Sequence, residues 1–227
     1  MTTHLEKLAS VGSEITPRHS SLSLQRHFPQ VAQNPVADEL TRLLLTRNGF
    51  FAFESALLLR PLTRKSPPLG IVEWNCPALW RNEYCPLPDD VVFFAEDVFG
   101  GQFGIVGKAV HYFDPEMGTL IEIAPSLDNW AKLILFERFD YWTGYTLAHE
   151  WQIQNGPLRP GFRLLPAVPF VCEGKYEVCN LGMIEDVEGM RFRAKIAKGI
   201  ATIPDGGSIT LTTDKESRIQ APPRQLP

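Results

Sequence analysis

The segment 91–130 constrains the fold of this chain most strongly. It reads VVFFAEDVFGGQFGIVGKAVHYFDPEMGTLIEIAPSLDNW, in which short apolar runs alternate with small or polar residues and each break carries turn residues. Residues 114–118 (DPEMG) are typical of a hairpin connection, because proline suits the first central turn position and glycine tolerates positive φ. An antiparallel series is therefore expected, with strands near 91–95, 102–107, 110–113 and 119–123.

Helical spacing of apolar residues flanks this series on both sides. A helix is predicted within 34–49, where an Asn-Pro pair supplies the cap and the first helical position. Ser126 is the predicted cap of a second helix over 127–141, and Trp130 on that helix is expected to pack on the sheet. A third helix is expected over about 143–154. The combination predicts an α+β fold, with helices packed on a mostly antiparallel or mixed central sheet.

The remaining elements are less sharply defined by the sequence. The dense apolar run 50–59 has a period that fits either helix or strand, and it is expected in the core. A short helix is predicted over 73–84. A strand is predicted over 175–181, an amphipathic helix over 187–201, and a last strand over 208–213 after a Pro-Asp-Gly-Gly turn.

Composition along the chain predicts four parts. Residues 1–33 mix polar and scattered apolar positions and are expected to form a loosely held arm, with a helical turn near residues 4–9. The α+β domain is expected over 34–155. A proline-rich connection opens an extension, 156–213, that is expected to pack on the same domain. The final stretch, 214–227, is polar and proline-rich, which predicts disorder.

Charge and cysteine usage limit the classes of function. The formal net charge of -4 argues against nucleic acid as a partner, and no apolar run is long enough to span a membrane. Nothing at the amino end has the pattern of a signal peptide. The cysteines are spaced too widely for a typical zinc site, so reduced and mostly buried thiols in the cytoplasm are expected. They are Cys76, Cys85, Cys172 and Cys179.

Several motifs together resemble the SUKH superfamily. They are 93–104 (FFAEDVFGGQFG), 127–130 (LDNW), 49–57 (GFFAFESAL), and the pairs Trp74-Asn75 and Trp80-Arg81. The resemblance covers roughly residues 35–155 and rests on fold-forming residues. It implies a compact α+β domain that recognises other proteins. Bacterial relatives are often cytoplasmic immunity proteins that neutralise a toxin from a competing or sibling cell.

No motif in the sequence indicates catalysis, a cofactor or a metal site. Gly100 and Gly101 precede a strand rather than a helix, so they are predicted to form a structural turn and not a phosphate cradle. His149 and Glu150 begin like a metalloprotease helix, but Ile153 occupies the position of the second histidine ligand. Core packing or an interface could each explain the aromatic concentration Tyr141, Trp142, Tyr145 and Trp151.

Acidic residues supply the predicted partner-binding surface. If the clustered carboxylates are functional, an acidic rim that pairs with a basic partner is the preferred interpretation, because charged rims raise association rate and selectivity. The residues proposed for this rim are Asp89, Asp90, Glu96 and Asp97.

Three functional hypotheses follow. The first is a non-catalytic cytoplasmic protein-binding domain, an immunity protein that binds and neutralises a bacterial toxin domain. The second is a housekeeping scaffold or regulator that docks a cellular protein. The third is an enzyme of unrecognised chemistry, which a deep pocket with convergent, perturbed titratable groups would favour.

Overall fold

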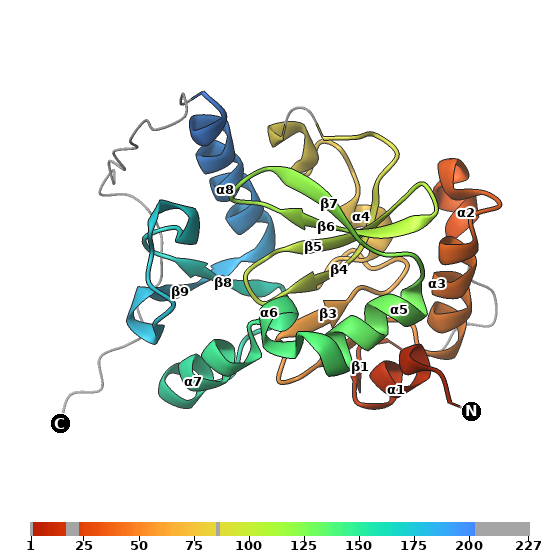
Figure 1. Cartoon of the computed structure of the whole chain (residues 1–227), viewed down its shortest axis with the longest axis horizontal. Helices are drawn as coiled ribbons and strands as arrows, with labels where there is room; N and C mark the ends of the chain where they lie inside the picture. The colour runs from red at the N-terminus through yellow and green to blue at the C-terminus, as the bar shows by residue number, and fades with distance from the viewer. Residues whose placement is uncertain (1, 17–22, 85–86, 203–227) are drawn as a thin grey trace.

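The computed structural model describes residues 2–16, 23–84 and 87–202, and it has an α+β architecture (Figure 1). The α-helices are α1 (His4–Ser10), α2 (Leu24–His27), α3 (Pro35–Thr46), α4 (Ile71–Trp74), α5 (Leu127–Lys132), α6 (Phe139–Thr143), α7 (Tyr145–Asn155) and α8 (Asp186–Ala201). A π-helical turn, Leu133–Glu137, joins α5 to α6. Short 3-10 turns are Pro29–Val31, Arg81–Glu83, Phe170–Cys172 and Val178–Asn180.

The central sheet has seven strands, all paired antiparallel and in chain order. They are β1 (Ser13–Glu14), β2 (Phe50–Ala52), β3 (Leu57–Leu59), β4 (Val92–Asp97), β5 (Gln102–Val106), β6 (Ala109–Asp114) and β7 (Thr119–Ala124). The four strands predicted between residues 91 and 123 correspond to β4–β7. A separate antiparallel pair is formed by β8 (Phe162–Pro166) and β9 (Leu181–Glu185).

Apolar residues of β4 point to both faces of the sheet, so both faces are covered. Phe94 packs in the larger core with α1, α3 and α5, while Phe93 packs in a second core with α8 and the segment after α4. Trp130 on α5 is fully buried against the rings of Phe94 and Phe103, as the sequence predicted. Figure 1 shows β4 and β5 in the middle of these layers.

The carboxyl-terminal part of the described chain completes the molecule beside the end of β4. The β8–β9 pair and α7 share a third core with Val98, just past β4, and the Leu164 amide donates to the Val98 carbonyl. Helix α8 agrees with the predicted helix over 187–201. The predicted strand over 208–213 and the predicted disordered tail over 214–227 lie outside the described residues.

The structure corrects several expectations about individual segments. Residues 1–33 are not a loose arm where they are described, because Leu8 and Leu24 are fully buried in the larger core. The predicted strand over 175–181 is instead a loop and a 3-10 turn, and the strand starts at Leu181. The predicted helix over 73–84 is reduced to α4 and one 3-10 turn.

The cysteines also differ from expectation. Cys76 and Cys179 are exposed and Cys172 is half-buried, so the three cysteines in the described residues are not core thiols. None of the helices in the described ranges is long and apolar enough to cross a membrane.

The turn between β4 and β5 needs both of its glycines. Gly100 has a φ of 81°, and a Cβ at Gly101 would lie 2.0 Å from the Tyr112 hydroxyl oxygen. We expect Gly100→Val to lower the free energy of unfolding by about 1 kcal/mol or more, because a β-branched residue is strained at positive φ. Gly199→Val is the control, since a Cβ there meets no atom within 4 Å. Equal urea midpoints for the two variants would contradict this role of Gly100.

Candidate functional site

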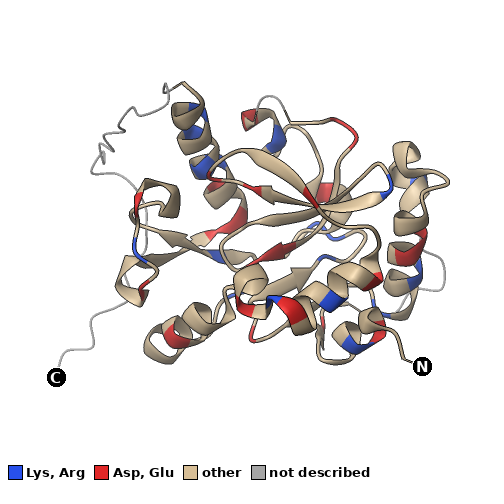
Figure 2. Ribbon diagram, viewed as in Figure 1, with Lys and Arg blue, Asp and Glu red and all other residues tan. Residues whose placement is uncertain are grey.

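A buried cluster of charged residues joins the central sheet to the β8–β9 pair and α8. The Glu96 carboxylate, at the end of β4, lies 2.8 Å from Arg60 Nη2 and 2.7 Å from Arg163 Nε. Arg60 Nη2 also lies 3.2 Å from Asp186 Oδ2 at the start of α8. All four side chains are nearly inaccessible to solvent. Figure 2 shows acidic positions on β4 and at the start of α8 next to a basic position on β8.

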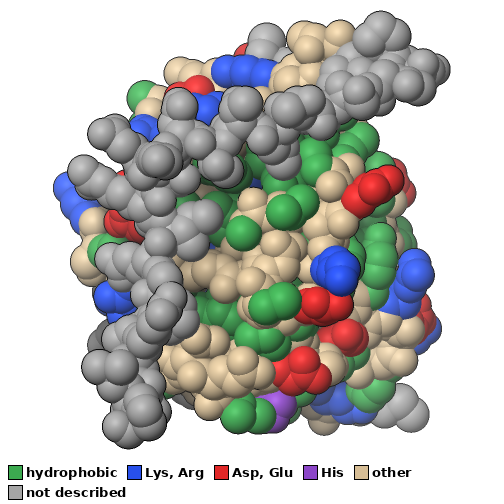
Figure 3. All heavy atoms as spheres, turned by 90° about the vertical axis from the view of Figure 1, so that its left-hand side faces the viewer, with side chains coloured by type: hydrophobic (Ala, Val, Ile, Leu, Met, Phe, Trp, Pro, Cys, Tyr) green, Lys and Arg blue, Asp and Glu red, His purple; other side chains and the backbone are tan. Residues whose placement is uncertain are grey.

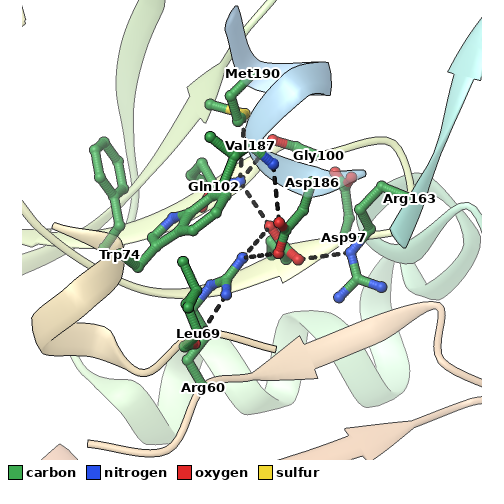
Figure 4. Close-up of polar contacts among 12 residues, drawn as sticks. Arg60, Leu69, Trp74, Asp97, Gly100, Gln102, Arg163, Asp186, Val187 and Met190 are labelled. Carbon is green, nitrogen blue, oxygen red and sulfur yellow. Dashed lines mark hydrogen bonds and ion pairs between the residues drawn. The ribbon is translucent and has the colours of Figure 1, made fainter. Parts of the chain in front are cut away.

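Neutral side chains fix the geometry of this cluster (Figure 4). Gln102 donates to Glu96 Oε2 and accepts from the indole of Trp74 at 2.8 Å. The Arg60 guanidinium stacks on the Trp74 ring at 3.5 Å. Burial alone would raise the pKa of Glu96, but Arg163 and Arg60 hold it below its ordinary value. Glu96 therefore acts as an ionised brace between Arg60 and Arg163, which are far apart in the sequence.

The prediction that Glu96 and Asp97 form a solvent-facing binding rim is wrong. Both side chains are buried and hydrogen-bonded inside the domain, with exposed fractions of 1 % and 4 %. The reason is that β4 is central in the sheet, so its last residues meet β8, α8 and β6 rather than water. Asp89 and Asp90 are exposed in the loop before β4, near Arg81, and their role in partner binding stays a prediction.

Asp97 is a structural carboxylate with an unusual environment. Its Oδ1 accepts from the amides of Phe99 and Gly101, and its Oδ2 accepts from the Tyr112 hydroxyl at 2.8 Å. Burial raises the pKa of Asp97 to about 6, because these hydrogen bonds offset only part of the lost hydration. The side chain therefore orders the glycine turn while remaining able to take up a proton near pH 6.

This shift predicts a pH-dependent effect of Asp97→Asn. The native state holds its proton up to about pH 6, whereas the unfolded chain releases it near 3.8, so ionisation of Asp97 destabilises the fold as pH rises between these values. Asparagine can accept from the same two amides without ionising. We expect the variant to match the wild type at pH 4 and to be more stable at pH 7 by up to ~3 kcal/mol. Urea unfolding at both pH values measures this, and a less stable variant at pH 7 would contradict it.

A cleft of about 800 Å³ opens beside Asp97. Its lining comes from the β4–β5 turn, the end of β6 with the β6–β7 turn, α6 and α7, the loop at 170–176, and Arg193 of α8. The elements meet here because the third core holds α7 and the β8–β9 pair against the end of β4. Figure 3 views the left-hand side of Figure 1 and shows acidic side chains close to a basic one and to apolar ones.

Negative charge dominates the cleft. Five carboxylates line it, and none forms a salt bridge within the described residues. Arg193 is the single Lys or Arg among the described lining residues, and it is almost fully buried. Burial raises the pKa of Glu116, and the charge of Arg193 offsets part of that effect. The carboxylates are Asp97, Asp114, Glu116, Asp140 and Glu150.

Aromatic residues form two further parts of the lining. One set runs outward from Phe99 through Phe170 to Tyr176, where the first contact is edge-to-face at 5.2 Å between ring centroids and the second is stacked at 3.9 Å. The other runs from Tyr112 through the buried Trp142 to Tyr141, with centroids 5.2 Å and 4.8 Å apart. Tyr141 and Tyr176 end these sets with exposed fractions of 64 % and 69 %. Large exposed aromatic residues of this kind are enriched at protein interfaces.

Sequence reasoning found only part of this cleft. Tyr141 belonged to the predicted aromatic concentration, in which Trp142 and Trp151 are core residues and Tyr141 lies in the cleft. The sequence predicts a hairpin at 114–118, and it does not predict that this turn shares a surface with the loop at 170–176. No sequence motif marks Arg193 or Tyr176 as a binding residue, because only the fold brings α8 and the loop at 170–176 to the β4–β5 turn. Within the described residues, no group of three or more His, Cys, Asp or Glu could hold a metal ion.

Comparison with known proteins supports the fold and no more. No protein-family model matches the chain, and no curated protein does. The crystal structure of Atu4351 from Agrobacterium tumefaciens is similar, with a TM-score of 0.56 and 10% sequence identity. The match covers 84% of this chain and 88% of that chain. At this identity the similarity shows a shared α+β fold.

Proposed function

We propose that this chain is a non-catalytic, cytoplasmic protein-binding domain of the SUKH type, and that it is an immunity protein that neutralises a bacterial toxin. The observation that carries the proposal is the cleft, in which three outer carboxylates, Asp114, Asp140 and Glu150, form no salt bridge within the described residues and lie near the exposed Tyr141 and Tyr176. Unpaired negative charge attracts a basic partner, and rigid aromatic side chains supply contact area at low entropic cost. The motif resemblance at residues 35–155 supports the toxin as the partner.

The binding surface in this proposal differs from the rim predicted from the sequence. Asp140 and Glu150 are exposed and replace the buried Glu96 and Asp97 as the carboxylates available to a partner. Met117, Tyr141 and Tyr176 border them as exposed apolar or aromatic groups. The brace around Glu96 has the separate task of holding α8, and with it one wall of the cleft, in place.

The test begins with co-purification of the full chain from its native cell and identification of the bound protein. We expect Asp140→Asn combined with Glu150→Gln to weaken binding of that protein at least fivefold, because two attractive charges are lost while the fold is kept. The matched control is Glu122→Gln with Glu188→Gln, two exposed carboxylates outside the cleft. If the wild type, the cleft double variant and the control double variant all bind the partner equally well, the partner binds another surface.

A second candidate function, acid–base catalysis, is favoured by one observation. Asp97 and Glu116 both have raised pKa values and both line the cleft, as catalytic carboxylates often do. Titration of the partner's activity separates the two functions. If the partner's activity is fully inhibited at one molecule of this chain per molecule of partner, and the Asp97→Asn variant inhibits equally well, the result supports binding. If less than one molecule of this chain per partner removes all of the partner's activity, and the Asp97→Asn variant no longer does so, the result supports catalysis.

A further inference from the structure

If the cleft is the partner-binding surface proposed above, its lining specifies the chemical group that the partner presents. The three outer carboxylates retain unused acceptor oxygens. Asp114 accepts from the Glu116 and Met117 amides through Oδ1, and Asp140 accepts from the Thr146 amide through Oδ1. Glu150 has no hydrogen bond or ion pair within the described part of the chain. These oxygens favour a cation that donates several hydrogen bonds.

The aromatic residues favour a flat organic cation over a metal ion. The Tyr176 ring is stacked on Phe170 with an interplanar angle of 4°, and it therefore forms a flat wall. Tyr176 lines the same cleft as Asp114 and Glu116. A guanidinium stacks on aromatic faces and donates in a planar fork to carboxylates, whereas an ammonium is a compact point charge.

Arg193 is a second, independent feature of the cleft that indicates a ligand. Its side chain is 1 % exposed, and it reaches the cleft from α8 beside Gly100. Only Nη2 has a hydrogen bond within the described residues, to the Leu164 carbonyl at 2.8 Å. The same guanidinium can donate to a peptide carbonyl, whereas a free polyamine has no acceptor to offer it. The cleft thus combines a donor for peptide backbone with acceptors for a basic side chain.

We propose that the cleft binds one arginine side chain of the partner protein, with its guanidinium against Tyr176 and the outer carboxylates, because the Tyr141 ring already carries the guanidinium of the domain's own Arg138 at 4.3 Å. The partner's adjacent backbone carbonyl accepts from Arg193. Asp97 and Glu116 serve as inner counter-charges to Arg193, since their oxygens already accept hydrogen bonds from the domain itself. The partner is therefore a protein with an exposed arginine on its contact surface.

The test is a titration of the full chain with three tripeptides, followed by NMR. The probes are acetyl-Gly-Xaa-Gly-amide with arginine, lysine or citrulline at Xaa. We expect the arginine peptide to shift the resonances of Tyr176, and to bind about two- to fivefold more tightly than the lysine peptide. Citrulline has the same shape without the charge, so its peptide is expected to cause no shift at the same concentration.

Variants locate the bound side chain. Glu150→Gln and Tyr176→Leu are each expected to weaken the arginine peptide about two- to fivefold, and Glu122→Gln to leave it unchanged. To test for occupancy of the cleft by the chain itself, the titration is repeated with Arg218 and Arg224 replaced by glutamine. Tighter peptide binding after that change would show self-occupancy and overturn the assignment to a partner.

Three outcomes separate this inference from the proposed function. Equal shifts with arginine and citrulline peptides would overturn the arginine assignment, even if the partner still binds the cleft. Shifts confined to residues outside the cleft would overturn it as well. The Asp140→Asn and Glu150→Gln double variant could lose partner neutralisation while the wild type binds the arginine, lysine and citrulline peptides equally. That result would support the proposed function and reject the binding of a partner arginine in the cleft.

Discussion

Replacing Glu96 with glutamine is expected to lower the free energy of unfolding by about 3–5 kcal/mol, the cost of breaking a buried ion pair by removing one partner. The carboxylate is 1 % exposed and is the nearest counter-charge for Arg163, at 2.7 Å, and for Arg60, at 2.8 Å. Within the described residues, the variant leaves Arg163 without an ion-pair partner and leaves Arg60 with Asp186 alone. Urea unfolding at pH 7 measures the loss.

The matched control is the same substitution in an exposed pair. Glu83 lies 3.7 Å from Lys198 with both side chains about half exposed, so Glu83→Gln is expected to change stability by less than about 1 kcal/mol. A similar small loss for Glu96→Gln would show that the buried cluster is hydrated and does not brace α8 against the sheet.

Truncation of Trp130 to alanine is expected to cost about 3–5 kcal/mol, because a fully buried indole leaves a cavity between α5 and the sheet. Its ring contacts Phe94 and Phe103 at centroid distances of 5.2 Å and 5.4 Å. The Nε1 atom has no hydrogen-bond partner in the described residues, so Trp130→Phe is expected to lose much less. Thermal and urea unfolding report both effects.

An exposed aromatic residue on the same helical segment supplies the control for Trp130. Phe136 is 61 % exposed, and Phe136→Ala is expected to change stability by about 0.5 kcal/mol or less. A loss below about 1 kcal/mol for Trp130→Ala would mean that the α5–sheet contact is not a core contact.

The strands between residues 91 and 124 could be predicted because local patterns specify them. Alternating apolar positions and turn residues define β4–β7, and the same logic finds α8. The hairpin within 50–59 could not be recognised in this way. Its turn places Phe53, Glu54 and Ser55 at positive φ without any glycine, and α7 holds it through hydrogen bonds to Glu54.

The charged residues show why the candidate site was only partly predictable. Asp and Glu are usually exposed, so two carboxylates at a strand end were interpreted as surface groups. Their burial depends on partners remote in sequence, such as Arg163, which lies 67 residues after Glu96. The cleft also depends on residues that are remote in sequence, since the packing of α8 and the β8–β9 pair brings Tyr176 and Arg193 to the cleft that Asp114 lines.

The measurement that tests the central claim most directly is photo-crosslinking from the cleft in the native cell. A benzoylphenylalanine residue replaces Tyr176 in the full chain, and in a control it replaces Ile121, which is 52 % exposed on β7 and outside the cleft. The cleft as partner-binding surface predicts one crosslinked protein from position 176, lost when Asp140→Asn and Glu150→Gln are added. Crosslinking of the partner from position 121 but not from position 176 would contradict it.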